Sequence, residues 1–202
     1  MFSSRQSGLQ TALYAVASFF GKSILIFIIT YATVINNSTF VQCCAYSVGQ
    51  AAQPILSTNY GAGNAARIRE TLFLALGTSM AFAAFWTGLS ELAPGLYIRI
   101  FMRPTDAILA IAPSIIRRYG VSFILLPVNI FSTYYFQSIL RPKDSFIVSI
   151  ARGLVVSGLL IFALPAIFAP DSIWWAMPLT ELVTFVYVGF AMRRDTRALP
   201  QN

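Results

Sequence analysis

The sequence predicts an all-α integral membrane protein: a six-transmembrane-helix bundle that forms a single lobe over residues 1–202. Hydrophobic residues make up 57% of the chain and charged residues only 10%, against about 25% charged in ordinary soluble domains. The charges are also spaced so that long uncharged stretches separate them, each close to the roughly 20 residues that cross a bilayer. The chain contains no His, which excludes Ser-His-Asp triads and His-ligated zinc within it.

The first two spans come from the uncharged stretches 6–21 and 23–66, which Lys22 separates. We predict spans over 8–30 and 33–58. The turn between them falls either at 21–22 (Gly21-Lys22) or at 36–39 (Asn36-Asn37-Ser38-Thr39), and the residues alone leave both positions open.

The other four spans follow from shorter gaps between charges. The uncharged stretch 71–90 predicts a span over 71–93, and the stretch 119–140 predicts a span with the same bounds. The stretches 153–170 and 172–192, the latter interrupted only by Glu181, predict spans over 146–169 and 172–192.

The basic residues predict the orientation. With both termini cytoplasmic, the inner segments carry eight basic residues and the outer turns three, as the positive-inside rule requires. The net charge of +7 is therefore a topology signal, spread over every loop, and we expect no nucleic-acid partner. The inner residues are Arg5, Arg67, Arg69, Arg141, Lys143, Arg193, Arg194 and Arg197, and the outer ones are Lys22, Arg99 and Arg103.

Two predicted spans carry polar side chains at helical spacing, so each set falls on one face of its helix. Lipid cannot hydrogen-bond these groups, so both faces must meet protein or water. Two interpretations stay open: the side chains join helices to one another, or they line a shared wet cavity. The first set is Gln42, Tyr46, Gln50, Gln53 and Ser57, and the second is Ser122, Asn129, Thr133 and Gln137, with Tyr134 beside it.

Glu181 is the residue whose burial in lipid costs most, since it interrupts the last span with a carboxylate. Arg152, in the preceding span, is the partner we expect. Either the two form a structural ion pair, or Glu181 takes part in coupling or substrate binding. Pro54, Pro127, Pro165 and Pro178 each lie in a predicted span, where a missing N–H favours a kink.

The segment 53–64 reads Gln-Pro-Ile-Leu-Ser-Thr-Asn-Tyr-Gly-Ala-Gly-Asn and is followed by Arg67-Ile68-Arg69. It resembles the signature of multidrug and toxic compound extrusion (MATE) transporters that closes the eighth of their twelve helices. The motif residues are Pro54, Asn59, Tyr60, Gly61, Ala62, Gly63 and Asn64. The same glycines match a dinucleotide-binding fingerprint, but no strand precedes them and no acid lies about 20 residues on, so we discount that interpretation.

The resemblance is to the C-terminal half of the family and implies its fold and function. It implies one lobe of an antiporter, not an enzyme, that exports small cationic organic compounds against sodium or protons without a bound cofactor. The other lobe would be a missing N-terminal half or a second copy of this chain. The expected location is the bilayer of a bacterial inner or plasma membrane. The expected cavity residues are Gln42, Tyr46, Gln50, Gln53, Asn129, Thr133, Tyr134 and Gln137.

Two alternatives remain at this stage. The chain could be a truncated fragment of a longer MATE transporter that inserts but does not transport. It could also be a relative of lipid-linked sugar flippases, which share the two-lobe architecture but would lack the Asn-Tyr-Gly-Ala-Gly-Asn loop at 59–64.

Overall fold

The computed structural model describes residues 38–101, 104 and 106–199. The predicted span 8–30 and the candidate turn Gly21-Lys22 lie outside these residues. Of the other candidate turn, Ser38 and Thr39 are described, and both already belong to a helix over 38–61.

The described chain is helical from end to end, and no β-strand occurs in it. After the helix 38–61 come α2 (Ala65–Leu92), α3 (Pro94–Phe101), α4 (Asp106–Gly120), the 3-10 turn η1 (Val121–Ile124), α5 (Leu126–Ser138), α6 (Pro142–Ile150), the π-helical turn η2 (Ala151–Val155), α7 (Val156–Ile167), the 3-10 turn η3 (Pro170–Trp175) and α8 (Ala176–Arg197).

Four helical stretches in the described part are long and apolar enough to cross a membrane: Ala65–Leu92, Ile108–Ser138, Pro142–Ile167 and Pro170–Arg197. The chain is therefore an integral membrane protein. The helix 38–61, where we predicted the span 33–58, is not among the four. Its three glutamines lower its hydropathy, although its 24 residues would extend about 36 Å at 1.5 Å per residue.

The largest difference from the predicted layout is in residues 94–118, which lie between two predicted spans. They form α3 and most of α4, so that α4, η1 and α5 make one helical stretch that begins well before residue 119. The reason is an apolar face at positions i, i+4, i+7 and i+8, namely Ile108, Ala112, Ile115 and Ile116. All four are at least 96% buried, and counting charges missed them because Asp106, Arg117 and Arg118 leave only a short uncharged stretch.

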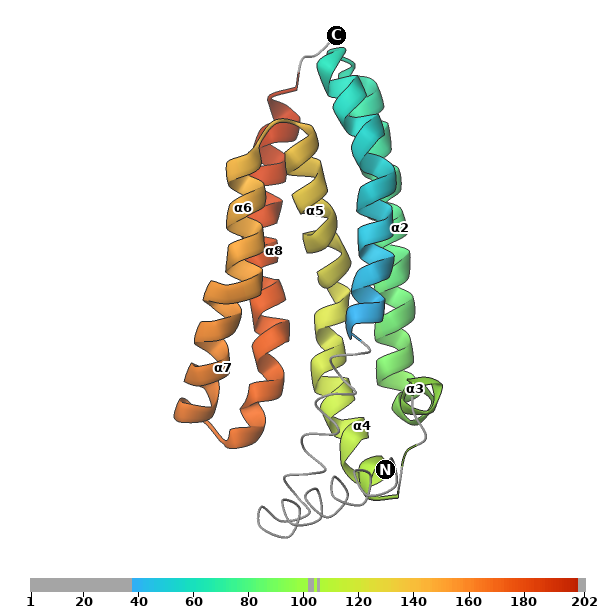
Figure 1. Ribbon diagram of the computed structural model, residues 1–202, viewed down its shortest axis with the longest axis vertical. Coiled ribbons are helices and arrows are strands. Elements are labelled where there is room, and N and C mark those ends of the chain that lie inside the picture. Colours follow the sequence, from blue (N-terminus) through green and yellow to red (C-terminus); the bar gives the residue numbers. More distant parts are fainter. Residues whose placement is uncertain (1–37, 102–103, 105, 200–202) are drawn as a thin grey trace, which may run out of the picture.

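Helix α5 occupies the centre of the bundle (Figure 1). The helix 38–61 and α2 run side by side along one flank of α5, and α6, α7 and α8 lie along the other. The side chains of α5 are buried along almost its whole length, including Phe131, Tyr135 and Phe136, which have no exposed surface. A helix buried on all sides can present polar groups only to other helices, and this is what positions the site.

Two of the four prolines begin helices instead of interrupting them. Pro127 is the second residue of α5 and Pro178 the third of α8, and both helices follow a 3-10 turn. In the first turn the N–H that proline lacks has no intrahelical partner to lose. Pro54 and Pro165 lie inside the helix 38–61 and α7.

Candidate functional site

The buried centre of the site is an ion pair between α8 and the π-helical turn η2. Arg152 Nε donates to Glu181 Oε1 at 2.6 Å, and Asn129 Nδ2 of α5 donates to Glu181 Oε2 at 2.7 Å and to the Glu181 carbonyl at 2.9 Å. Glu181 and Asn129 have no exposed surface, and the Arg152 side chain is 15% exposed. Both oxygens of the carboxylate are therefore engaged, one by a cation and one by an amide.

The π-helical turn explains how Arg152 reaches this position. A π turn holds one residue more than an α turn, and such turns are frequent at functional sites. Here the turn spans Ala151–Val155, between α6 and α7. It shifts the side chains beyond it around the helix axis, and Arg152 lies within it, directed at α8.

Two tyrosines form the part of the site nearest to this ion pair. Tyr46, on the helix 38–61, lies beside the Arg152 guanidinium and meets Tyr134 of α5 edge to face, with ring centroids 6.4 Å apart. The Tyr134 ring fits against Gly49, where an added Cβ would come within 2.2 Å of it. Gly49 therefore sets how closely the helix 38–61 and α5 approach.

One helical turn further along, amide side chains replace the aromatic ones. Gln53 Nε2 donates to Gln137 Oε1 at 3.4 Å, and Gln137 Nε2 donates to Ser145 Oγ of α6 at 3.1 Å. Ser138 Oγ reaches the Gln53 carbonyl at 3.3 Å. These bonds link the helix 38–61, α5 and α6, and Gln137 is an exposed residue.

We call the set Tyr46, Gln53, Tyr134, Gln137 and Arg152 the polar wall. The structure brings these predicted residues together, with Asn129 and Glu181 behind them. It does not bring in the rest of the prediction to the same degree. Toward residues that the structure describes, Gln42 and Gln50 make no side-chain hydrogen bond, and the Thr133 hydroxyl donates to the Ile130 carbonyl of its own helix at 2.8 Å.

The motif loop closes the end of the bundle beyond Gln53. Gly63 adopts a left-handed φ of +68°, which favours glycine, and the Asn64 side chain caps α2 by accepting from the Arg67 N–H at 3.2 Å. Asn59 Nδ2 donates to the Ile55 carbonyl at 2.8 Å. Of the other motif residues, Pro54 and Gly61 lie in the helix 38–61, Ala62 lies in the turn, and Tyr60 borders a cavity of about 380 Å³ with Arg141 and Asp195.

The arrangement matches a known family. Its model, described as MatE, matches residues 28–162, roughly two thirds of the chain. The chain belongs to the MATE family. Members of this family are transporters, not enzymes, so the motif at 53–64 identified the family correctly.

Two solved structures are similar to this MATE chain. One is the MATE multidrug transporter DinF-BH in complex with a rhodamine dye, which is 27% identical over 95% of this chain with a TM-score of 0.73. The other, an outward-facing multidrug resistance MATE family transporter of the MOP superfamily, is 16% identical over 87% of this chain with a TM-score of 0.67 and shows the fold alone. The chain covers 42% and 43% of these two proteins, less than half of each. Comparison with curated protein sequences gives no match.

Sequence reasoning missed an ionic network at the motif-loop end of this MATE lobe. Arg194 of α8 contacts Asp144 at 2.9 Å and Asp195 at 2.8 Å, and Tyr187 Oη donates to Asp144 at 2.6 Å. Arg141 lies 3.9 Å from Asp195. The signal was available, because acids at 144 and 195 stand among the basic residues of two inner loops, but we counted only the basic ones.

Proposed function

We propose that this chain is one lobe of an efflux transporter that exports small cationic organic compounds, with the polar wall as its contribution to the substrate pathway. The observation that carries the proposal is the Tyr46–Tyr134 pair beside an ion pair that is neutral as a whole. Aromatic faces attract organic cations, and the glutamine amides offer acceptors. The Arg152 charge is balanced by Glu181, so it does not repel a cation from this wall.

The other lobe completes the pathway in this proposal. This chain corresponds to less than half of the MATE structures it resembles, so the second lobe is supplied by an N-terminal half or by a second copy of the chain. Rocking of two such lobes about a central site gives alternating access. The excess of basic residues in the predicted inner loops supports cytoplasmic termini, in a bacterial inner or plasma membrane.

Sodium or proton entry drives export in this proposal, as the family resemblance implies. Glu181 is the acid nearest to the polar wall, but both of its carboxylate oxygens already accept hydrogen bonds, from Arg152 and Asn129. We therefore assign Glu181 to the structural ion pair, and we assign the coupling ion to no residue of this chain.

Dye efflux tests the proposal. Drug-sensitive cells that express these 202 residues are loaded with ethidium or with the rhodamine dye of the DinF-BH complex, and dye loss is followed by fluorescence. We expect Tyr46→Ala and Gln137→Ala to slow efflux about tenfold, a loss of roughly 1.4 kcal/mol. Ser114→Ala is the control, because that hydroxyl bonds the carbonyl of Ile111 within α4.

Two results would overturn the proposal. Efflux that Tyr46→Ala and Gln137→Ala leave unchanged would exclude the polar wall from the pathway. Wild-type chain that inserts in the membrane but exports neither dye would favour a non-transporting fragment. Membrane insertion is therefore measured in every strain by protease protection, so that lost efflux is not confused with lost protein.

A further inference from the structure

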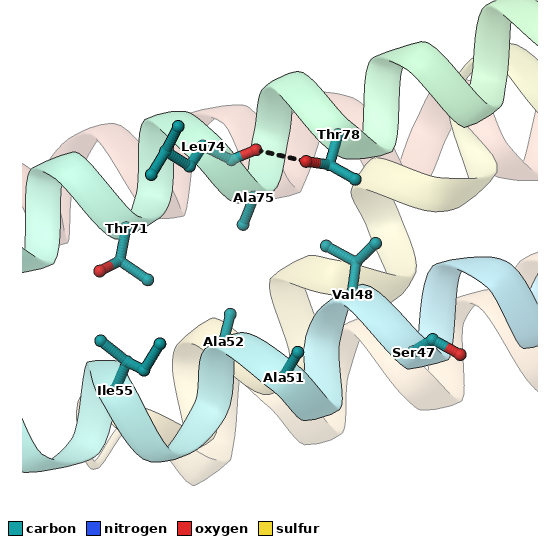
Figure 2. Close-up of a pocket in the computed structure, with 9 residues that line it drawn as sticks. All are labelled: Ser47, Val48, Ala51, Ala52, Ile55, Thr71, Leu74, Ala75 and Thr78. Carbon is teal, nitrogen blue, oxygen red and sulfur yellow. Dashed lines mark hydrogen bonds between the residues drawn. The ribbon is translucent and has the colours of Figure 1, made fainter.

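A second hollow lies on the other side of the helix 38–61, and the polar wall does not include it. It is a groove of about 410 Å³ between this helix and α2, a volume within the range of roughly 300–1,000 Å³ that ligand pockets occupy. Figure 2 shows Val48, Ala51 and Ala52 on one helix facing Leu74 and Ala75 on the other. The small alanines leave the space between the two helices.

The groove offers almost nothing polar to an occupant. Three hydroxyls border it, and each donates to a carbonyl one turn back in its own helix. Ser47 bonds the Cys43 carbonyl at 2.9 Å, Thr71 that of Arg67 at 2.8 Å, and Thr78 that of Leu74 at 2.9 Å; the last bond is drawn in Figure 2. With its donors already used, the groove suits a hydrocarbon occupant better than a polar molecule.

The length of the groove agrees with one leaflet of a bilayer. From Ile55 to Ser47 it follows eight residues of helix, about 12 Å at 1.5 Å per residue. Half of a hydrocarbon core of about 30 Å is roughly 15 Å. A single acyl chain lying along the two helices would therefore fill most of the groove.

A cation stands at the motif-loop end of the groove. Arg67 is four and eight residues before Thr71 and Ala75, which places it on the same face of α2 at 100° per residue. It pairs with Glu70 at 2.9 Å, but both side chains are more than half exposed, and such surface pairs contribute about 0–1 kcal/mol. A phosphate can therefore compete for this guanidinium.

We propose that the groove holds one acyl chain of an anionic phospholipid, whose phosphate pairs with Arg67. The charge at one end and the apolar length beyond it match the two parts of such a lipid, and basic groups near the ends of membrane helices recognise anionic head groups in the same way. The site is independent of the proposed transport function, because it lies on the face of the helix 38–61 opposite the polar wall.

Native mass spectrometry of the purified chain in detergent micelles tests the site, with dioleoylphosphatidylglycerol as the anionic probe and dioleoylphosphatidylcholine as the zwitterionic one. We expect Arg67→Gln to reduce retention of the anionic lipid about fivefold and to leave the zwitterionic lipid unchanged. Arg69→Gln is the matched control, an exposed arginine on the other face of the same turn. Glu70→Gln, which releases Arg67, should increase retention of the anionic lipid.

A second pair of variants tests the groove itself. Ala51→Phe fills it and should reduce retention of the anionic lipid at least fivefold. Ala84→Phe, at an exposed position on the far face of α2, should not, and circular dichroism confirms that both variants remain folded. Equal retention in Ala51→Phe and Ala84→Phe would overturn the site. Equal retention in Arg67→Gln and Arg69→Gln would show a hydrocarbon site without head-group recognition, and a dimer that only Ala51→Phe dissociates would show that a second copy occupies the groove; either result overturns the proposal.

Discussion

Arg152 and Glu181 are 29 residues apart in sequence and meet at 2.6 Å, with the carboxylate fully buried. Because the carboxylate also accepts from Asn129, three separate helical segments of the bundle are joined at one acid. Removing one member of a buried pair leaves the other charge uncompensated, which costs more than the pair itself contributes. The consequences can be measured one residue at a time.

A double-mutant cycle on this pair should show strong coupling. We expect Glu181→Leu and Arg152→Leu each to lower the free energy of unfolding by about 3–5 kcal/mol, because each leaves a buried charge alone. The double variant should lose less than the sum of the two, since it removes both charges. The measurement is unfolding by sodium dodecyl sulfate in mixed micelles, and strictly additive losses would contradict a direct pair.

Asn129 should matter more than its uncharged side chain suggests. Asn129→Ala removes two donated hydrogen bonds to Glu181 and leaves one carboxylate oxygen buried without its amide partner. We expect a loss of about 2–4 kcal/mol, at roughly 1–2 for each hydrogen bond to a charged or buried acceptor. Thr133→Val is the control, because Thr133 bonds only its own helix, and it should cost less than about 1 kcal/mol. Similar losses in the two variants would contradict the assignment.

Gly49 and Gly77 should respond to alanine with opposite signs. The new Cβ of Gly49→Ala would lie 2.2 Å from the Tyr134 ring, so the two helices must separate, at a cost of about 1–3 kcal/mol. At Gly77, inside α2, the added Cβ meets open space, and alanine should stabilise the helix by about 0.5–1 kcal/mol. Melting followed by circular dichroism checks both, and a stabilised Gly49→Ala would show that the contact is not tight.

The ionic network at the motif-loop end should contribute more than an exposed pair. Asp195→Asn removes the charge of a carboxylate that is only 3% exposed and lies beside Arg194 and Arg141, so we expect the melting temperature to fall by several degrees. Asp171→Asn is the comparison, because its pair with Arg118 is longer, at 3.7 Å, and largely exposed. We expect that change to be close to neutral, and an equal effect of the two would argue against the network.

The sequence predicted the site better than the ends of the helices. The four-residue spacing of Gln42, Tyr46 and Gln50 placed them on one face, and the structure turns that face toward α5 and Arg152. Periodicity fixes a face but not a partner, which is why Tyr46 and Gln53 find neighbours across the interface while Gln50 makes no bond to described residues. The partner depends on how far along the bundle each helix packs, and no local pattern encodes that.

The helical structure at 94–118 and the π-helical turn were missed for different reasons. Counting charges finds long apolar spans but cannot find α4, whose apolar face is interrupted by polar residues on its other side. Nothing local in Ala151–Val155 predicts a π turn. Its position follows from a tertiary requirement, that Arg152 face Glu181 while the residues before and after it still pack.

The π-helical turn also divides the stretch 142–167 into two helical phases. Before it, buried positions such as Asp144 and Val148 recur every four residues, and Val148 to Arg152 continues that step. The next buried residue is Ser157, five positions beyond Arg152. The inner face of α7 is thus in register with α6 only because one extra residue is held at the junction. Deleting any single residue from 151–155 would turn all of α7 by about 100°, exposing Ser157 to lipid while leaving the composition of the span almost unchanged.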